Sequence, residues 1–189
     1  MTRAAVRGLW RALASLTGAL ALSAVAALPS GAGTVTQGIT CPTPNSLTAT
    51  IADMTLAPVT YSETSQDSAG TMTITAAEAG CAAQGWNVTV QSSDWIRLDG
   101  GPAIPASAFS VTQVETPASV SGQGIDAFGG PRQVNNVGTL NQSRKVLQAQ
   151  PGYGLGAYSQ VLGVKLTIPG TALPGTYKSV VTTTITTGP

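Results

Sequence analysis

Residues 71–76 read TMTITA, and this short stretch predicts the class of fold. Met72, Ile74 and Ala76 alternate with three threonines, so one set of side chains is apolar and the other is polar. Side chains of a β-strand point alternately to opposite faces of the sheet. A period of two residues therefore predicts a strand with one face in a core and the other in water.

The same alternation recurs along the chain and predicts an all-β protein. It is seen in residues 47–51, 86–91, 109–111, 162–168 and 177–186. Glycine and proline pairs such as Pro169-Gly170 and Pro174-Gly175 separate these runs as turn signals. Several one-sided strands with turns between them predict an immunoglobulin-like antiparallel β-sandwich.

Between residues 115 and 143 the alternation dissolves into Gly, Gln, Asn and Ser. Loops of this length tend to be functional or mobile. The segment is predicted to be either a long surface excursion or a poorly ordered loop.

The N-terminal segment has the parts of a secretory signal. Three arginines and no acid lie in the first eleven residues, an apolar run follows over residues 13–28, and small residues come after Pro29. Cleavage after Ala32 or after Ala26 fits the small-x-small pattern, and the position of Pro29 favours Ala32. We expect a signal peptide over residues 1–32 and a single β-sandwich domain over residues 33–189. An uncleaved membrane anchor is the alternative, but the apolar run is shorter than the roughly 20 residues that span a bilayer.

Charge and composition exclude several classes of partner. Only 9% of residues are charged, and without Arg3, Arg7 and Arg11 six basic residues face eight acidic ones. Nucleic acids and anionic membranes require clustered basic surface. No second apolar run of spanning length follows the signal. We therefore expect neither nucleic acid nor membrane as a partner of the mature, secreted protein.

The chain has two cysteines, Cys41 and Cys81, and no histidine. An even number of cysteines in an exported protein predicts a disulfide, with two free thiols as the alternative. Two cysteines alone do not complete a tetrahedral zinc shell, so no metal site is expected. We expect no cofactor either.

No group of residues indicates catalysis. The absence of histidine removes every mechanism that needs a histidine base. The acidic residues are scattered, and Asp94 and Asp99 are expected to be solvated turn residues rather than a catalytic pair. We therefore predict a protein that is not an enzyme and has no catalytic residue.

The aromatic residues suggest where binding would occur. Trp86 shares a strand face with Val88 and Val90, which predicts a core position. Trp95 lies in a segment flanked by turns and is predicted to be outside the core. With Tyr153 and Tyr158, which lie among glycines, Trp95 is a candidate for a surface platform that binds glycan.

Three segments, in order, resemble the WxL-type domains of bacterial cell surfaces. They are Gly85 to Val90, Lys145 to Gly156 with its Gly-Tyr-Gly-x-Gly run, and Leu166 to Tyr177 with the Thr-rich strand after it. Unlike the family's last strand, residues 181–186 contain no tryptophan. The resemblance implies non-covalent association with the cell wall, through envelope glycan or other surface proteins.

A second resemblance is to fimbrial subunits and coat-like domains. Residues 34–40 alternate just before Cys41, and Cys81 follows 40 residues later. Such subunits self-associate by donating a strand to a neighbour's sheet. A self-assembling structural subunit is therefore the alternative to a binding domain.

Overall fold

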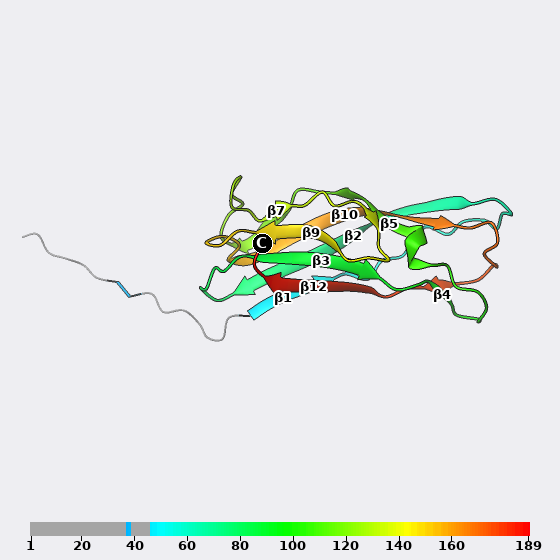
Figure 1. The fold of residues 1–189 in the computed structure, drawn as a ribbon, viewed down its shortest axis with the longest axis horizontal. Helices are drawn as coiled ribbons and strands as arrows, with labels where there is room; N and C mark the ends of the chain where they lie inside the picture. Colours follow the sequence, from blue (N-terminus) through cyan, green and yellow to red (C-terminus); the bar gives the residue numbers. More distant parts are fainter. Residues whose placement is uncertain (1–36, 39–45) are drawn as a thin grey trace, which may run out of the picture. The chain divides into compact units, whose positions relative to one another are not determined.

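The computed structural model describes residues 37–38 and 46–189, and the chain divides into two units, residues 1–38 and 39–189, each described by itself. The second unit is built almost entirely of antiparallel strands (Figure 1). Their bounds are β1 Ser46–Ile51, β2 Gln66–Ala79, β3 Trp86–Ser92, β4 Ile96–Arg97, β5 Phe109–Val114, β6 Ala118–Gly122, β7 Arg132–Gln133, β8 Gly138–Thr139, β9 Arg144–Ala149, β10 Gly156–Ile168, β11 Tyr177–Lys178 and β12 Val181–Thr187. A single turn of 3-10 helix, η1 Ala106–Ala108, precedes β5.

The larger sheet is organised around β10. This 13-residue strand pairs with β2 along its whole length, from Gly156↔Glu78 to Ile168↔Gln66. Its other edge pairs first with β6 and then with β5. β1 pairs with the free edge of β2, and β8 pairs with β5.

The smaller sheet has the order β12-β3-β9-β7, and a ribbon of β4 and β11 extends beyond it. The two sheets pack face to face, which confirms the predicted antiparallel β-sandwich (Figure 1). Within residues 37–38 and 46–189, no helix has the length and apolar character needed to span a bilayer.

The predicted alternation places the core residues. Met72, Ile74 and Ala76 of β2 are fully buried, and the threonines between them are exposed. In β3, Trp86 and Val88 are fully buried, which confirms that Trp86 is a core residue. Burial of each such side chain stabilises the fold by roughly 1.5–3 kcal/mol, so the apolar set determines which face of each strand turns inward.

One polar side chain joins the two layers inside the core. The amide of Gln160 on β10 donates hydrogen bonds to the carbonyls of Glu115 and Val146, at 2.9 and 3.2 Å. Val146 belongs to β9, so this contact links the larger sheet to the smaller one. If the two sheets were offset differently, the buried amide would lose these acceptors. The hydrogen bonds therefore favour a single alignment of the two layers.

Residues 115–143 are predicted to be a long surface excursion or a poorly ordered loop, and the structure places three short strands in them. They contain β6, β7 and β8, each paired with a longer strand. All five residues of β6 are exposed on both faces. These strands are held by backbone pairing rather than by one-sided burial, so they leave no alternation in the sequence.

The last predicted strand, residues 177–186, is divided in two. β11 pairs with β4, whereas β12 pairs with β3. At the break, the Ser179 hydroxyl donates to the carbonyl of Ser93 at 2.7 Å, and the Val180 amide donates to the Ser93 hydroxyl at 3.0 Å. Serine side chains here add to a single backbone bond, from the Ser93 N–H to the Val180 carbonyl at 2.9 Å, where the chain passes from one partner strand to another.

Cys81 lies in the turn between β2 and β3. Cys41 and the signal peptide predicted for residues 1–32 lie outside the described residues, as does the predicted domain start at residue 33. The disulfide and the cleavage site therefore stay predictions.

Candidate functional site

The structure contradicts the prediction that Tyr158 lines a surface platform. Its side chain is fully buried and packs against Trp86, with ring centroids 6.1 Å apart. Its hydroxyl lies 2.8 Å from the carbonyl of Gln123 and 2.9 Å from that of Leu155. Burial, and then the nearby charge of Glu78, raise the pKa of Tyr158. Tyr158 is a core residue whose hydroxyl anchors the chain just after β6.

Trp95 also differs from its predicted position. It is half-buried, packs against the core and meets Phe109 edge-on, with ring centroids 5.1 Å apart. Its backbone forms an isolated bridge with Ile104. The indole Nε1 is buried and has no hydrogen-bond partner in the part of the chain that the structure describes. Trp95 therefore closes one end of the core and does not form an exposed platform.

Tyr153 lies at the other end of the sandwich. Its ring is half-buried against Gly129, where the ring occupies the space that a Cβ would need. Trp95 contacts Phe109, which pairs with Leu166 near the end of β10, whereas Tyr153 lies just before β10 begins. The three predicted binding residues therefore do not form one site.

The glycines around Tyr153 are required by the core beside them. Gly154 has a φ of +86°, and a Cβ there would lie 2.6 Å from the indole Nε1 of Trp86. That indole donates a hydrogen bond of 3.1 Å to the Gly154 carbonyl. The Gly-Tyr-Gly run is thus a close backbone approach to Trp86, the role that glycine often has beside a strand.

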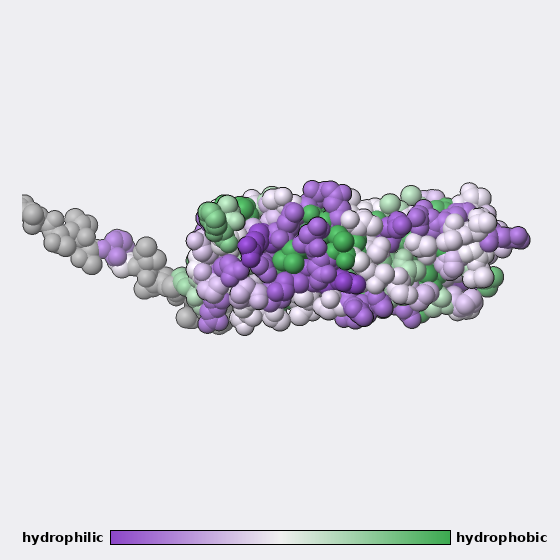
Figure 2. All heavy atoms as spheres, turned by 45° about the horizontal axis from the view of Figure 1, so that its top comes forward, coloured by the Kyte–Doolittle hydropathy of each residue, from purple (hydrophilic) through white to green (hydrophobic). Residues whose placement is uncertain are grey.

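Among the residues that the structure describes, the most exposed large apolar side chain lies on the loop between β6 and β7. Phe128 is 86% exposed, and Ile125 on the same loop is 42% exposed. We call these two residues the aromatic tip. Figure 2 shows hydrophobic residues gathered at the end of the body that carries this loop. Sequence reasoning missed the tip, because a single phenylalanine in a glycine-rich segment has no periodicity.

The turn that presents Phe128 is held by hydrogen bonds. Asp126 Oδ1 accepts from the backbone N–H of Phe128 at 2.8 Å and of Gly129 at 2.7 Å. These two bonds hold the pKa of Asp126 below its usual value. The backbone of Asp126 also pairs with Gly130, and the Gln150 N–H donates to the Gly129 carbonyl. The Asp-x-x-Gly spacing is the sequence signal for such a turn.

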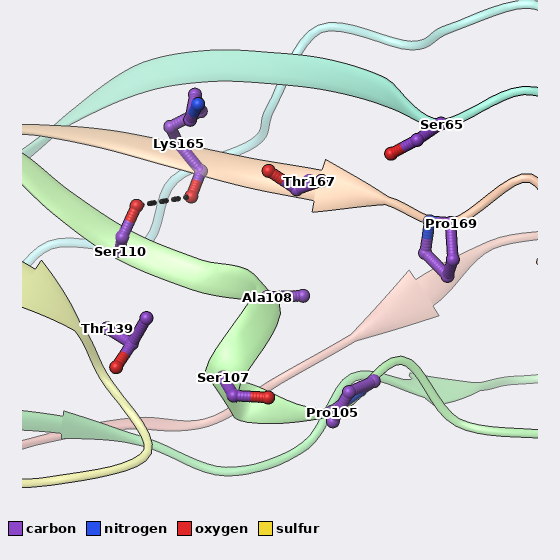
Figure 3. Close-up of a pocket in the computed structure, with 9 residues that line it drawn as sticks. All are labelled: Ser65, Pro105, Ser107, Ala108, Ser110, Thr139, Lys165, Thr167 and Pro169. Atoms are coloured by element: carbon purple, nitrogen blue, oxygen red, sulfur yellow. Dashed lines mark hydrogen bonds between the residues drawn. The ribbon is translucent and has the colours of Figure 1, made fainter.

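A shallow pocket of about 450 Å³ lies near the other end of β10. We call it the hydroxyl-lined pocket; its walls are Ser65, Pro105, Ser107, Ala108, Ser110, Thr139, Lys165, Thr167 and Pro169. Figure 3 shows these residues, which come from η1, β5, β8, β10 and the segments next to them. Lys165 forms a 3.0 Å ion pair with Asp67, whose other oxygen accepts from the Thr167 hydroxyl at 2.7 Å.

Asp94 and Asp99 each have a structural partner. Asp94 Oδ1 accepts a 2.7 Å hydrogen bond from the Ala106 backbone at the start of η1, and Asp99 lies 3.8 Å from Arg97. Among residues 37–38 and 46–189, no three Asp, Glu, Cys or His side chains lie close enough together to hold a metal ion. Asp94 and Asp99 are therefore used to shape and stabilise turns.

Glu78, at the end of β2, is the one buried acid in the described ranges. Burial raises the pKa of its carboxyl, and a hydrogen bond from the Ala83 backbone opposes this effect. Its Oε2 has no hydrogen-bond partner among the described residues. Glu78 contributes to a small cleft with Leu47 and Gln84, at the same end of the sandwich as Tyr158.

Comparison with known proteins leaves the function open. No family model matches the chain, and no curated protein matches it. Among solved structures, it is similar to a family 123 glycoside hydrolase from Clostridium perfringens, with a TM-score of 0.38 and 14% identity. The match covers 75% of this chain but only 25% of that one, and is too distant to bear on activity.

Proposed function

We propose that this protein is a secreted, non-catalytic binding domain of the bacterial cell surface. Its partner is a cell-envelope glycan or another surface protein, and the aromatic tip makes the central contact. The exposed Phe128, held on a hydrogen-bonded turn, is the single observation on which this proposal rests most.

An exposed phenylalanine side chain is in contact with water, and its burial against a partner would favour binding. Burial of a phenylalanine side chain is worth roughly 1.5–3 kcal/mol, and Phe128 leaves most of this unused in the isolated domain. Because Asp126 already fixes the turn, little backbone entropy remains to be lost on binding. Rigid aromatic anchors of this kind dominate many binding interfaces.

The contact is expected to be uncharged. Ile125 and Phe128 are apolar, and the carboxylate of Asp126 is directed at backbone N–H groups. Screening by salt weakens interactions between charges, but it does not weaken apolar contacts. Binding should therefore persist at high ionic strength.

Secretion is supported by the sequence of residues 1–32 and by the even cysteine count. The WxL-like segments support a surface location. Two of these segments, Gly85 to Val90 and Lys145 to Gly156, contain the two partners of the Trp86–Gly154 hydrogen bond. In this chain they therefore form part of the core behind the aromatic tip.

The test is a wall-pelleting assay with three proteins. Wild type should pellet with purified cell walls and stay bound up to about 1 M salt. Phe128→Ser should reduce pelleting by about tenfold or more. Leu98→Ser is the matched control, because Leu98 is 63% exposed at the other end of the sandwich, near β4. Equal pelleting of both variants, or release at moderate salt, would contradict the proposal.

A self-assembling structural subunit is the second candidate. The residues proposed for strand donation, 34–40, lie outside the described residues except for Gln37 and Gly38. The observation that favours self-assembly is a different one. The molecule carries an apolar projection at one end and a pocket near the other.

A further inference from the structure

The aromatic tip and the hydroxyl-lined pocket lie near opposite ends of β10. The tip's turn is tied to Gln150, just before β10 begins, whereas the pocket includes Lys165, Thr167 and Pro169 at its end. The 13 residues of β10 span about 40 Å at 3.3 Å per residue. Phe128 therefore cannot enter the pocket of its own chain.

We propose that the hydroxyl-lined pocket receives the aromatic tip of a second copy, so that successive molecules associate head to tail. This inference rests on the proposed role of the tip in binding, and it gives the tip a partner besides the cell wall. That partner is another molecule of the same chain.

The pocket has the size and lining to hold an aromatic side chain. Its volume of about 450 Å³ leaves room for a benzyl group together with part of the turn that carries it. Pro105, Ala108 and Pro169 give it apolar walls (Figure 3). When an aromatic ring packs against proline or aliphatic side chains, both apolar surfaces are removed from water, which favours the contact.

Charge does not oppose the contact. The one cation in the pocket, Lys165, is already paired with Asp67 at 3.0 Å. On the tip, Asp126 accepts two backbone hydrogen bonds and faces its own turn. Neither surface therefore brings an unpaired charge into the interface, whose desolvation would be costly.

The geometry does not close the assembly at two copies. A contact between two different surfaces of the same molecule is heterologous, and it forms a ring or an extended chain rather than a closed dimer. Each added copy still carries a vacant pocket or a free tip. A single inserted phenylalanine is a small interface, so association is expected only at high protein concentration.

Two variants separate the halves of the contact. Phe128→Ser removes the tip and leaves the pocket, whereas Ser107→Trp fills the pocket and leaves the tip. Ser107 is an exposed residue of η1, so the larger side chain does not disturb the core. Leu98→Ser is again the control.

The experiment is sedimentation velocity of the mature protein from about 5 μM to about 500 μM. Wild type and Leu98→Ser should sediment faster as concentration rises, whereas each pocket or tip variant alone should associate about 10- to 100-fold more weakly. An equimolar mixture of Phe128→Ser and Ser107→Trp retains one intact tip and one intact pocket per pair. It should form a dimer that grows no further.

Wild type that stays monomeric at the highest concentration would overturn the inference, and so would a mixture without dimers. The wall-pelleting assay separates this failure from failure of the proposed function. Ser107→Trp should still pellet with walls, because its tip is intact, whereas Phe128→Ser should lose both activities. A glycan that binds wild type but not Ser107→Trp would assign the pocket to glycan instead.

Discussion

Substituting phenylalanine for Trp86 or for Trp95 applies the same chemical change to two tryptophans in different environments. The indole of Trp86 is fully buried and donates to the carbonyl of Gly154, which is itself buried. Trp86→Phe leaves that carbonyl without this donor, at a cost of about 1–3 kcal/mol, and the lost ring volume adds about 1 kcal/mol. The expected total is about 2–4 kcal/mol. For a domain of this size that lowers Tm by roughly 5–15 °C.

Trp95→Phe removes an indole N–H that has no partner among the described residues, so no hydrogen bond is lost. Phenylalanine retains much of the edge-on contact with Phe109, and the expected loss is below about 1 kcal/mol. Urea denaturation followed by far-ultraviolet circular dichroism measures both, without relying on tryptophan fluorescence. Equal losses, or a larger loss for Trp95→Phe, would show that the Trp86–Gly154 bond does not have the importance assigned to it.

Three further outcomes are expected. Burial raises the pKa of Glu78 above its usual 4.5, so the folded protein favours the neutral carboxyl. The stability that the neutral carboxyl contributes is lost as pH rises through the folded pKa. Glu78→Gln should therefore raise Tm at pH 7 and change it little near pH 3, and a pH-independent difference would refute the assignment. Thiol titration of the unfolded, unreduced mature protein should find no free thiol, and Cys81→Ser should cost about 4 kcal/mol of stability if it opens a loop of about 40 residues. Tyr158→Phe should cost only about 1 kcal/mol, because the carbonyls of Gln123 and Leu155 each keep another donor; a loss above about 3 kcal/mol in urea melts would mean that its hydroxyl is indispensable to the fold.

The strands that form the core were predictable, because burial on one face imposes alternation on the sequence. In β2 and β3 the buried apolar residues are those expected, but Ser68, Glu78 and Ser92 are buried as well, and β2 runs through the Ala69-Gly70 pair that reads as a turn in the sequence. β6 was not predictable in this way, since both of its faces are exposed and its pairing with β10 uses only the backbone.

The position of Tyr158 was present in the sequence as a weaker signal. The buried face of β10 runs through Leu162, Val164 and Leu166, and two steps backward along the same face lead to Gln160 and Tyr158. The glycines before Tyr158 favour a loop interpretation, and this hid its place in the strand. Phe128 differs, because its exposure depends on a turn formed by Asp126 and not on any repeating pattern.

The central place of β10 has a consequence for the order in which the chain folds. Its pairs are far apart in sequence, and Leu162 meets Met72 across about 90 residues. The cost of closing so long a loop precedes any gain from pairing, and sheets of this kind fold in milliseconds to seconds rather than microseconds. Until residue 168 has been synthesised, β2 lacks its main partner, and the β1–β2 hairpin leaves Met72 and Ile74 uncovered. A nascent chain therefore stays open until residue 168 has been made, and during this interval a chaperone would find it unfolded.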